Sequence, residues 1–205
     1  TLSKFLYLFY FLKNPADACY GVKREKRSSF LAALIMLILL VIIYILGLIY
    51  TGFIFNDTIL AETILLQEAF KIILPILIFV ISNYLMSSLM EGEGSFKAVF
   101  INTIGALMPI IVIYPFLIFI SNFLTLNEAF IYQFGLFGMF FWATILLYFN
   151  IKETHNYSVG QTFVNLFLSL IFMVVIVIVL LIVYLMISQV SGFVFDLVRE
   201  VILRE

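Results

Sequence analysis

Residues 154–195 read THNYSVGQTFVNLFLSLIFMVVIVIVLLIVYLMISQVSGFVF, and none of these 42 residues is Asp, Glu, Lys or Arg. An apolar helix of about 20 residues crosses the hydrocarbon core of a bilayer. Two further uncharged stretches are also long enough, 29 residues between Arg27 and Asp57 and 30 residues between Lys97 and Glu128. Only 11% of the 205 residues are charged, whereas a soluble domain has about 25%. The sequence therefore predicts a membrane protein that crosses the bilayer several times, and it excludes a soluble globular fold.

The composition also excludes several classes of function. Cys19 is the single cysteine and His155 the single histidine, so the chain lacks both an internal disulfide and a Cys/His metal-ligand pattern. The net charge of −1 provides no basic field for nucleic acid. None of the His-Glu-x-x-His, Gly-x-Ser-x-Gly or Walker lysine motifs occurs. We therefore expect no metal, no cofactor, no nucleic-acid partner and no enzymatic activity.

The apolar stretches predict an all-α fold, a five-helix transmembrane bundle. In water the Val- and Ile-rich runs could form strands, but in lipid a helix satisfies every backbone polar group within one segment. We expect an N-terminal cytoplasmic or interfacial segment (1–28), a transmembrane domain (29–188) and an extracellular amphipathic tail helix (189–205). The expected spans are residues 30–50, 72–90, 99–123, 129–151 and 162–188.

The basic residues predict the orientation of these spans. With five spans, the N-terminus shares one side of the membrane with the loops near residues 91–98 and 152–160. That side carries eight of the eleven basic residues, and cytoplasmic segments are enriched in Lys and Arg. We therefore expect a plasma-membrane protein with a cytoplasmic N-terminus and an extracellular C-terminus.

Both ends of the chain contain segments that we do not expect to span the membrane. Residues 2–12 are apolar but too short to cross it, so we place them at the interface. Asn14 and Pro15 are typical of a helix start, and that helix would lead toward the first span. At the other end, Phe193, Leu197 and Val201 belong to one apolar face of the tail helix, which can bind lipid or a partner protein.

Three further groups of residues are candidate contacts with a partner or with lipid. Lys23, Arg24, Lys26 and Arg27 can set the topology of the first span or recognise a protein or an acidic head group. Glu91 and Glu93 lie in a Gly-rich loop that is either a tight solvated turn or a partner contact. His155 has no second ligand or nucleophile beside it, so an interfacial loop position is favoured over a pH switch.

Polar residues within the spans predict contacts between helices. We expect hydrogen bonds from Asn83, Ser87, Ser88, Asn102, Thr103, Asn122 and Asn165. No Asp, Glu, Lys, Arg or His lies in the middle of an expected span, and such residues usually mark the paths of ions, protons and charged substrates. An ion-coupled carrier is therefore disfavoured.

Three stretches of the sequence have a recognisable pattern. The first is Lys13-Asn14-Pro15 with the later Lys-Arg-Glu-Lys-Arg-Ser-Ser of residues 23–29. The second is Leu-Met-Glu-Gly-Glu-Gly-Ser-Phe at 89–96, followed by Pro109, and the third is Thr-His-Asn-Tyr-Ser at 154–158. Together they resemble the Yip (Ypt-interacting-protein) domain family in its form from low-G+C Gram-positive bacteria. The resemblance implies a five-span membrane domain with no known catalytic residues. Bacterial proteins that resemble this one tend to be encoded beside carbohydrate ABC-transporter components, which implies an accessory role there.

Two functions remain open on the sequence. The first is a non-catalytic accessory or scaffold subunit that packs against other membrane proteins, with transporter permeases as candidate partners. The second is a permease or small channel for a neutral solute, which the prolines of the third span and the polar residues of the second span favour.

Overall fold

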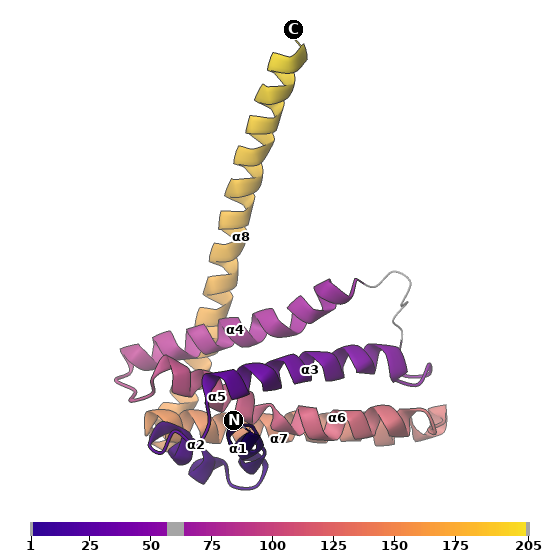
Figure 1. Cartoon of the computed structure of the whole chain (residues 1–205), viewed down its shortest axis with the longest axis vertical. Helices are drawn as coiled ribbons and strands as arrows, with labels where there is room; N and C mark the ends of the chain where they lie inside the picture. Colours follow the sequence, from indigo (N-terminus) through magenta and orange to yellow (C-terminus); the bar gives the residue numbers. More distant parts are fainter. Residues whose placement is uncertain (1, 57–63, 204–205) are drawn as a thin grey trace.

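The computed structural model describes residues 2–56 and 64–203, and the described residues contain helices but no strand. Figure 1 shows their arrangement. The helices are α1 (Leu2–Leu6), η1 (Tyr7–Leu12), α2 (Pro15–Lys23), α3 (Phe30–Tyr50), α4 (Leu65–Leu89), α5 (Phe96–Ala106), α6 (Met108–Ser121), η3 (Leu126–Glu128), α7 (Ala129–His155) and α8 (Val159–Leu203).

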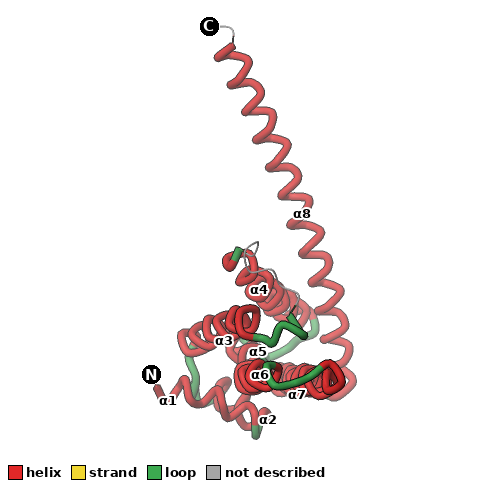
Figure 2. Tube along the Cα trace, turned by 90° about the vertical axis from the view of Figure 1, so that its right-hand side faces the viewer, coloured by secondary structure: helices red, strands yellow, loops and turns green. Residues whose placement is uncertain are grey.

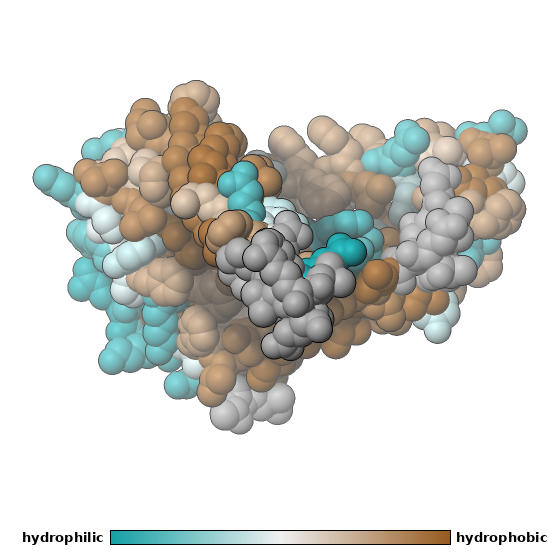
Figure 3. Space-filling model, turned by 90° about the horizontal axis from the view of Figure 1, so that it is seen from above, coloured by the Kyte–Doolittle hydropathy of each residue, from teal (hydrophilic) through white to brown (hydrophobic). Residues whose placement is uncertain are grey.

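Within the described residues, five helical segments are long and apolar enough to cross a membrane, which confirms the expected all-α bundle. They are Phe30–Tyr50, Leu65–Leu89, Phe96–Ser121, Leu126–His155 and Val159–Phe193. The second begins seven residues earlier than expected, and the fourth continues to His155. Figure 3 shows hydrophilic residues gathered toward the left, where the α4–α5 loop lies, and apolar residues over much of the remaining surface.

The third span is interrupted between α5 and α6. Pro109 has no N–H and cannot continue the hydrogen-bond ladder of an α-helix. Around this point the backbone hydrogen bonds join residues three apart instead of four. Leu107 N–H donates to the Ile104 carbonyl (3.1 Å), and Ile110 N–H donates to the Leu107 carbonyl (3.0 Å). The break therefore follows from the local sequence, whereas Pro75 and Pro115 lie inside uninterrupted helices.

Serine side chains fix the starts of three of these helices. Ser29 accepts a hydrogen bond from Ala32 N–H (3.2 Å) at α3, and Ser95 accepts one from Ala98 N–H (3.3 Å) at α5. At α8, Ser158 N–H donates to Gln161 Oε1 (2.9 Å) and Gln161 N–H donates to Ser158 Oγ (3.4 Å). These bonds satisfy N–H groups that have no partner within the helix.

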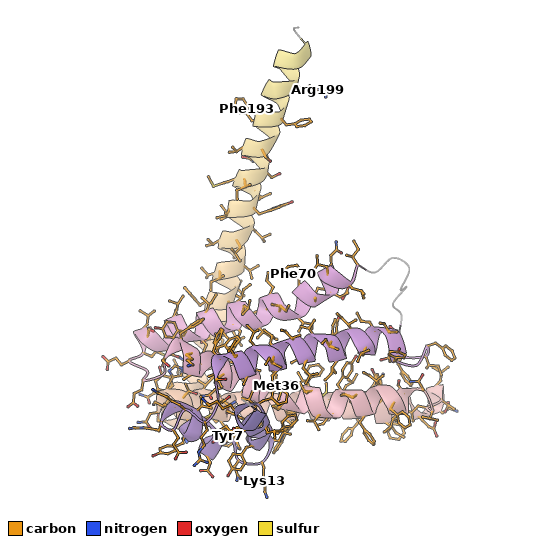
Figure 4. The ribbon with its side chains drawn as sticks, in the orientation of Figure 1. Tyr7, Lys13, Met36, Phe70, Phe193 and Arg199 are labelled. Atoms are coloured by element: carbon orange, nitrogen blue, oxygen red, sulfur yellow. The ribbon has the colours of Figure 1, made fainter. Side chains whose placement is uncertain are left out.

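The N-terminal segment, which the sequence places at the membrane interface, packs against the bundle through part of its apolar side chains. Leu8 and Phe11 are completely buried, in one apolar cluster with residues of α3 and α5 such as Met36 and Ile104. A Cβ atom on Gly105 would lie 2.8 Å from the Phe11 ring, so the ring can pack there because glycine has no side chain. Figure 4 shows Tyr7 and Lys13 on this segment beneath the long helices. Burial of apolar side chains therefore decides the position of residues 2–12.

The last helix, α8, contacts the other helices only near its start. Figures 1 and 2 show α3, α4, α6 and α7 running roughly side by side, whereas α8 leaves them at a steep angle. Its buried residues are Thr162, Asn165 and Ser169, and every described side chain from Val177 to Phe195 is exposed. The helix continues past residue 188 without interruption, so the expected span and the expected tail form one helix.

A ladder of polar side chains joins α8 to α4. Asn83 Nδ2 donates to Asn165 Oδ1 (2.8 Å) and to Ser169 Oγ (3.2 Å), while Asn165 Nδ2 donates to Ser87 Oγ (3.0 Å). The Ser82 hydroxyl also donates to the Ser169 carbonyl. All five residues are buried. The expected hydrogen bonds between spans are therefore present for Asn83, Ser87 and Asn165.

Substitution of Asn165 by Leu should loosen this contact. The Asn83 and Ser87 side chains would each lose a buried partner, and we expect the free energy of unfolding to fall by about 1–2 kcal/mol. Denaturation in mild detergent would measure the loss. Ser88→Ala is the matched control, because Ser88 is exposed and bonds only to the Tyr84 carbonyl of its own helix. Equal stabilities for the two variants would contradict the role of the ladder.

Candidate contact site at one end of the bundle

Three segments far apart in the sequence meet at one end of the bundle. They are the end of α2, the α4–α5 loop and the α7–α8 loop. Lys23 Nζ donates to Glu93 Oε2 (2.8 Å), and Asn156 Nδ2 donates to Glu93 Oε1 (3.5 Å). These segments are the three that carry the resemblance described above. Glu93 therefore connects the end of α2 to the turn after α7.

The α7–α8 turn packs against the glycines of the α4–α5 loop. The rings of His155 and Tyr157 stack with their centroids 5.3 Å apart, and Tyr157 Oη donates to the Ser87 carbonyl (3.2 Å). A Cβ atom on Gly92 would lie 2.5 Å from Tyr157 Oη, and one on Gly94 would lie 2.6 Å from His155 Cε1. Both glycines are required because the two rings approach the loop backbone so closely.

The structure buries His155 instead of leaving it in an interfacial loop. It is the last residue of α7 and only 2% exposed. Its two ring nitrogens have no hydrogen-bond partner among the described residues. His155 therefore positions the loop and cannot contact a partner while the chain is folded this way.

A second polar cluster lies next to His155, inside the bundle. Cys19 Sγ donates to Asn150 Oδ1 (3.0 Å), Asn150 Nδ2 donates to the Asn102 carbonyl (2.6 Å), and Asn102 Nδ2 donates to Thr154 Oγ1 (2.6 Å). Burial raises the pKa of the Cys19 thiol, so the thiol stays protonated and is a poor nucleophile. The cluster joins α2, α5 and α7. Its role is structural, and Asn102 was the only member expected to bond between helices.

The basic residues after α2 differ in their surroundings. Lys23 is held by Glu93, Arg27 forms an ion pair with Glu25 and lies over the Tyr7 ring, and Arg24 and Lys26 are exposed. Lys26 has a φ of 52°, which is a left-handed backbone conformation that residues other than Gly, Asn and Asp rarely adopt. Glu91 and Asn156 have similar φ values, 58° and 59°. Three tight turns therefore lie close to this end of the bundle.

Lys23, Lys26 and Glu93 line one cleft with residues of α5. The cleft has a volume of about 260 Å³, and Ser28, Ser95 and Lys97 also line it. The sequence placed Lys97 on the same side of the membrane but gave no reason to associate it with Lys26. The Ser95–Ala98 cap shows that the positive end of α5 lies here. The arrangement can attract an anionic group.

Three further candidates, Phe193, Leu197 and Val201, belong to α8, and Glu91 lies in the α4–α5 loop outside the cleft. Figure 4 shows Phe193 near the free end of α8, and its side chain is 64% exposed. The side chains of Leu197 and Val201 lie outside the residues that the structure describes. Glu91 is exposed in the α4–α5 loop and does not line the cleft. Of the candidate residues, Lys23, Lys26 and Glu93 line the cleft, and His155 packs beside it against the α4–α5 loop.

The fold and this junction define a multi-pass helical membrane protein. The family model described as Yip1 domain matches residues 9–191. The match covers most of the chain, so the chain belongs to the Yip1 domain family. Neither the curated proteins nor the solved structures contained a match.

Substitution of Gly94 by Ala should destabilise the junction. The new methyl group would overlap the buried His155 ring and the Thr154 methyl group, with an expected cost of about 1–3 kcal/mol. The cost should fall by about half in a His155→Ala background, since one of the two neighbours is then removed. Unfolding in detergent would measure both effects.

Gly138→Ala provides the control for this experiment. Gly138 lies inside α7, and a methyl group added there would have no neighbouring atom within 4 Å. Alanine should therefore be neutral or stabilising by up to about 1 kcal/mol at this position. Identical costs of Gly94→Ala with and without His155 would contradict the close approach.

The contact between Lys23 and Glu93 should depend on pH. The Lys23 ammonium lowers the pKa of the Glu93 carboxyl below its ordinary value of 4.5. The stabilisation is therefore fully present above pH 4.5 and is lost as the pH falls through the lowered pKa. The amide protection factors of residues 15–23, which correct for the slower intrinsic exchange in acid, should fall in acid for the wild type and change less with pH for Glu93→Gln. Parallel pH profiles would show that this contact does not hold α2.

Proposed function

We propose that this protein is a non-catalytic accessory or scaffold subunit that packs against other membrane proteins. The observation that carries the proposal is the isolation of α8, whose described side chains from Val177 to Phe195 are exposed. A second helix of a partner can pack along this length. The buried Asn and Ser side chains that join α4 to α8 are hydrogen-bonded to each other, so they hold the start of α8 against the bundle.

The same proposal includes the kind of partner. We take the assembly to be a carbohydrate ABC transporter of a low-G+C Gram-positive bacterium, with its permeases as neighbours of α8. The support is the resemblance of the three stretches that meet at Glu93. Membership in the Yip1 domain family is compatible with this partner but does not select it.

The proposal also includes an orientation in the plasma membrane. The end of the bundle that contains Lys23, Lys26 and Lys97 faces the cytoplasm, because basic residues favour that side. The loops expected to share this side do meet there, through Glu93 and Asn156. The C-terminal end of α8 then belongs to the opposite side.

Photo-cross-linking in native membranes tests the partner. A photoreactive residue at Val179 of α8 should give a discrete protein adduct, identified by mass spectrometry as a transporter permease. The matched control is Phe116, which is similarly exposed on α6 and should give only lipid adducts. An adduct with a different membrane protein would overturn the transporter assignment. No protein adduct from positions 177–185 would overturn the accessory function itself.

A permease for a neutral solute is the second candidate. The observation that favours it is a largely apolar cavity of about 420 Å³ between α3, α4, α6 and α7, with Pro75, Tyr44 and Tyr114 in its wall. Solute flux through the purified, reconstituted protein would support this function, and its absence would remove it.

A further inference from the structure

We infer that the cleft between α2 and α5 binds the phosphate group of an anion. Three lysines from two distant parts of the chain line it. Lys23 is the last residue of α2, Lys26 lies in the turn that follows, and Lys97 lies in the first turn of α5. Neither proposed function requires this site, so the inference is independent of both.

The charges around the cleft favour an anion. The lining contains three lysines and one acidic residue, Glu93, whose carboxylate is already paired with Lys23. The positive end of the α5 dipole adds to the same field, because Ser95 and Lys97 lie at the start of that helix. Lysine is a common ligand of phosphate groups in proteins. Basic residues that only determine membrane topology do not need to line the same cleft, as these three lysines do.

The backbone at Lys26 supports a role beyond topology. The turn is closed by a hydrogen bond from Arg27 N–H to the Gly21 carbonyl (3.0 Å), and Lys26 adopts its left-handed conformation within it. Gly or Asn would occupy this position with less strain. A strained residue whose side chain lines a cleft is a functional candidate.

The cleft has both polar and apolar residues in its lining. Lys26 and Ser95 are exposed and Ser28 is a buried polar residue, whereas Val22, Ala98 and Ile101 are buried apolar residues. A volume of about 260 Å³ accommodates a phosphate with a short attached group. The phosphate can belong to an anionic lipid head group or to a small soluble molecule, and the two sources share this chemistry.

Native mass spectrometry of the purified, delipidated full chain tests the inference. Phosphatidylglycerol and phosphatidylcholine with the same acyl chains are titrated separately, and glycerol 3-phosphate is added as a soluble competitor. We expect one phosphatidylglycerol to bind more tightly than phosphatidylcholine. Lys26→Asn and Lys97→Gln should each weaken it about fivefold, the effect of one basic residue on anionic lipid.

The variants separate charge from folding. Lys26→Asn removes the ammonium but suits the left-handed backbone, so the chain should fold at least as well as the wild type. Lys13→Gln is the control, because Lys13 is exposed, lines a different cavity and points away from the bundle in Figure 4. It should leave binding within about twofold of the wild type.

Each outcome decides the inference. Lipid binding that depends on Lys26 and Lys97 and resists glycerol 3-phosphate assigns the site to a lipid head group. Binding of glycerol 3-phosphate alone, with the same dependence, assigns it to a small phosphate. Two results would overturn the site when glycerol 3-phosphate does not bind either. One is equal binding of the two lipids, and the other is an equal effect of Lys26→Asn and Lys13→Gln on lipid binding.

Discussion

The pairing of Asn83 with Asn165 is the interaction on which the arrangement of the last span depends. Lipid offers no hydrogen bonds, so polar side chains in a span must find partners within the protein. Asn165 meets Asn83 and Ser87 where α8 begins, and Ser169 extends the contact by one turn. Farther along, from Val177 to Phe195, every described side chain of α8 is exposed. The ladder thus determines both where α8 attaches and where it becomes free.

The same end of the bundle carries the polar junction between loops. Glu93 contacts both Lys23 and Asn156, and the two glycines beside it admit the stacked rings of His155 and Tyr157. Helices that start at this end are therefore fixed relative to one another by short loops. The opposite end has contacts between loops as well: Gly52 N–H donates to Ser121 Oγ (2.9 Å), and Asn122 Nδ2 donates to the Tyr50 carbonyl (2.9 Å). The apolar cavity near Pro75 lies between the long helices.

The functional proposals follow from two surfaces of the structure. One end combines tight loops, exposed basic side chains and a cleft, which suits recognition of charged groups. The free length of α8 is apolar and suits a partner within the membrane. Two surfaces of different chemistry are typical of a protein that works through its contacts, and membership in the Yip1 domain family agrees with a membrane function.

The sequence by itself determined the class of protein and the five spans, because the cost of placing charge and unpaired backbone groups in lipid is a local property. It also indicated Asn83, Asn102 and Asn165 as bonding residues, since amides within a span need partners. Only the tertiary structure decided that Leu8 and Phe11 enter the core, that His155 is buried and that Lys97 joins Lys26. Those positions depend on packing between distant segments, such as Phe11 against Gly105, and no local pattern encodes which segments meet.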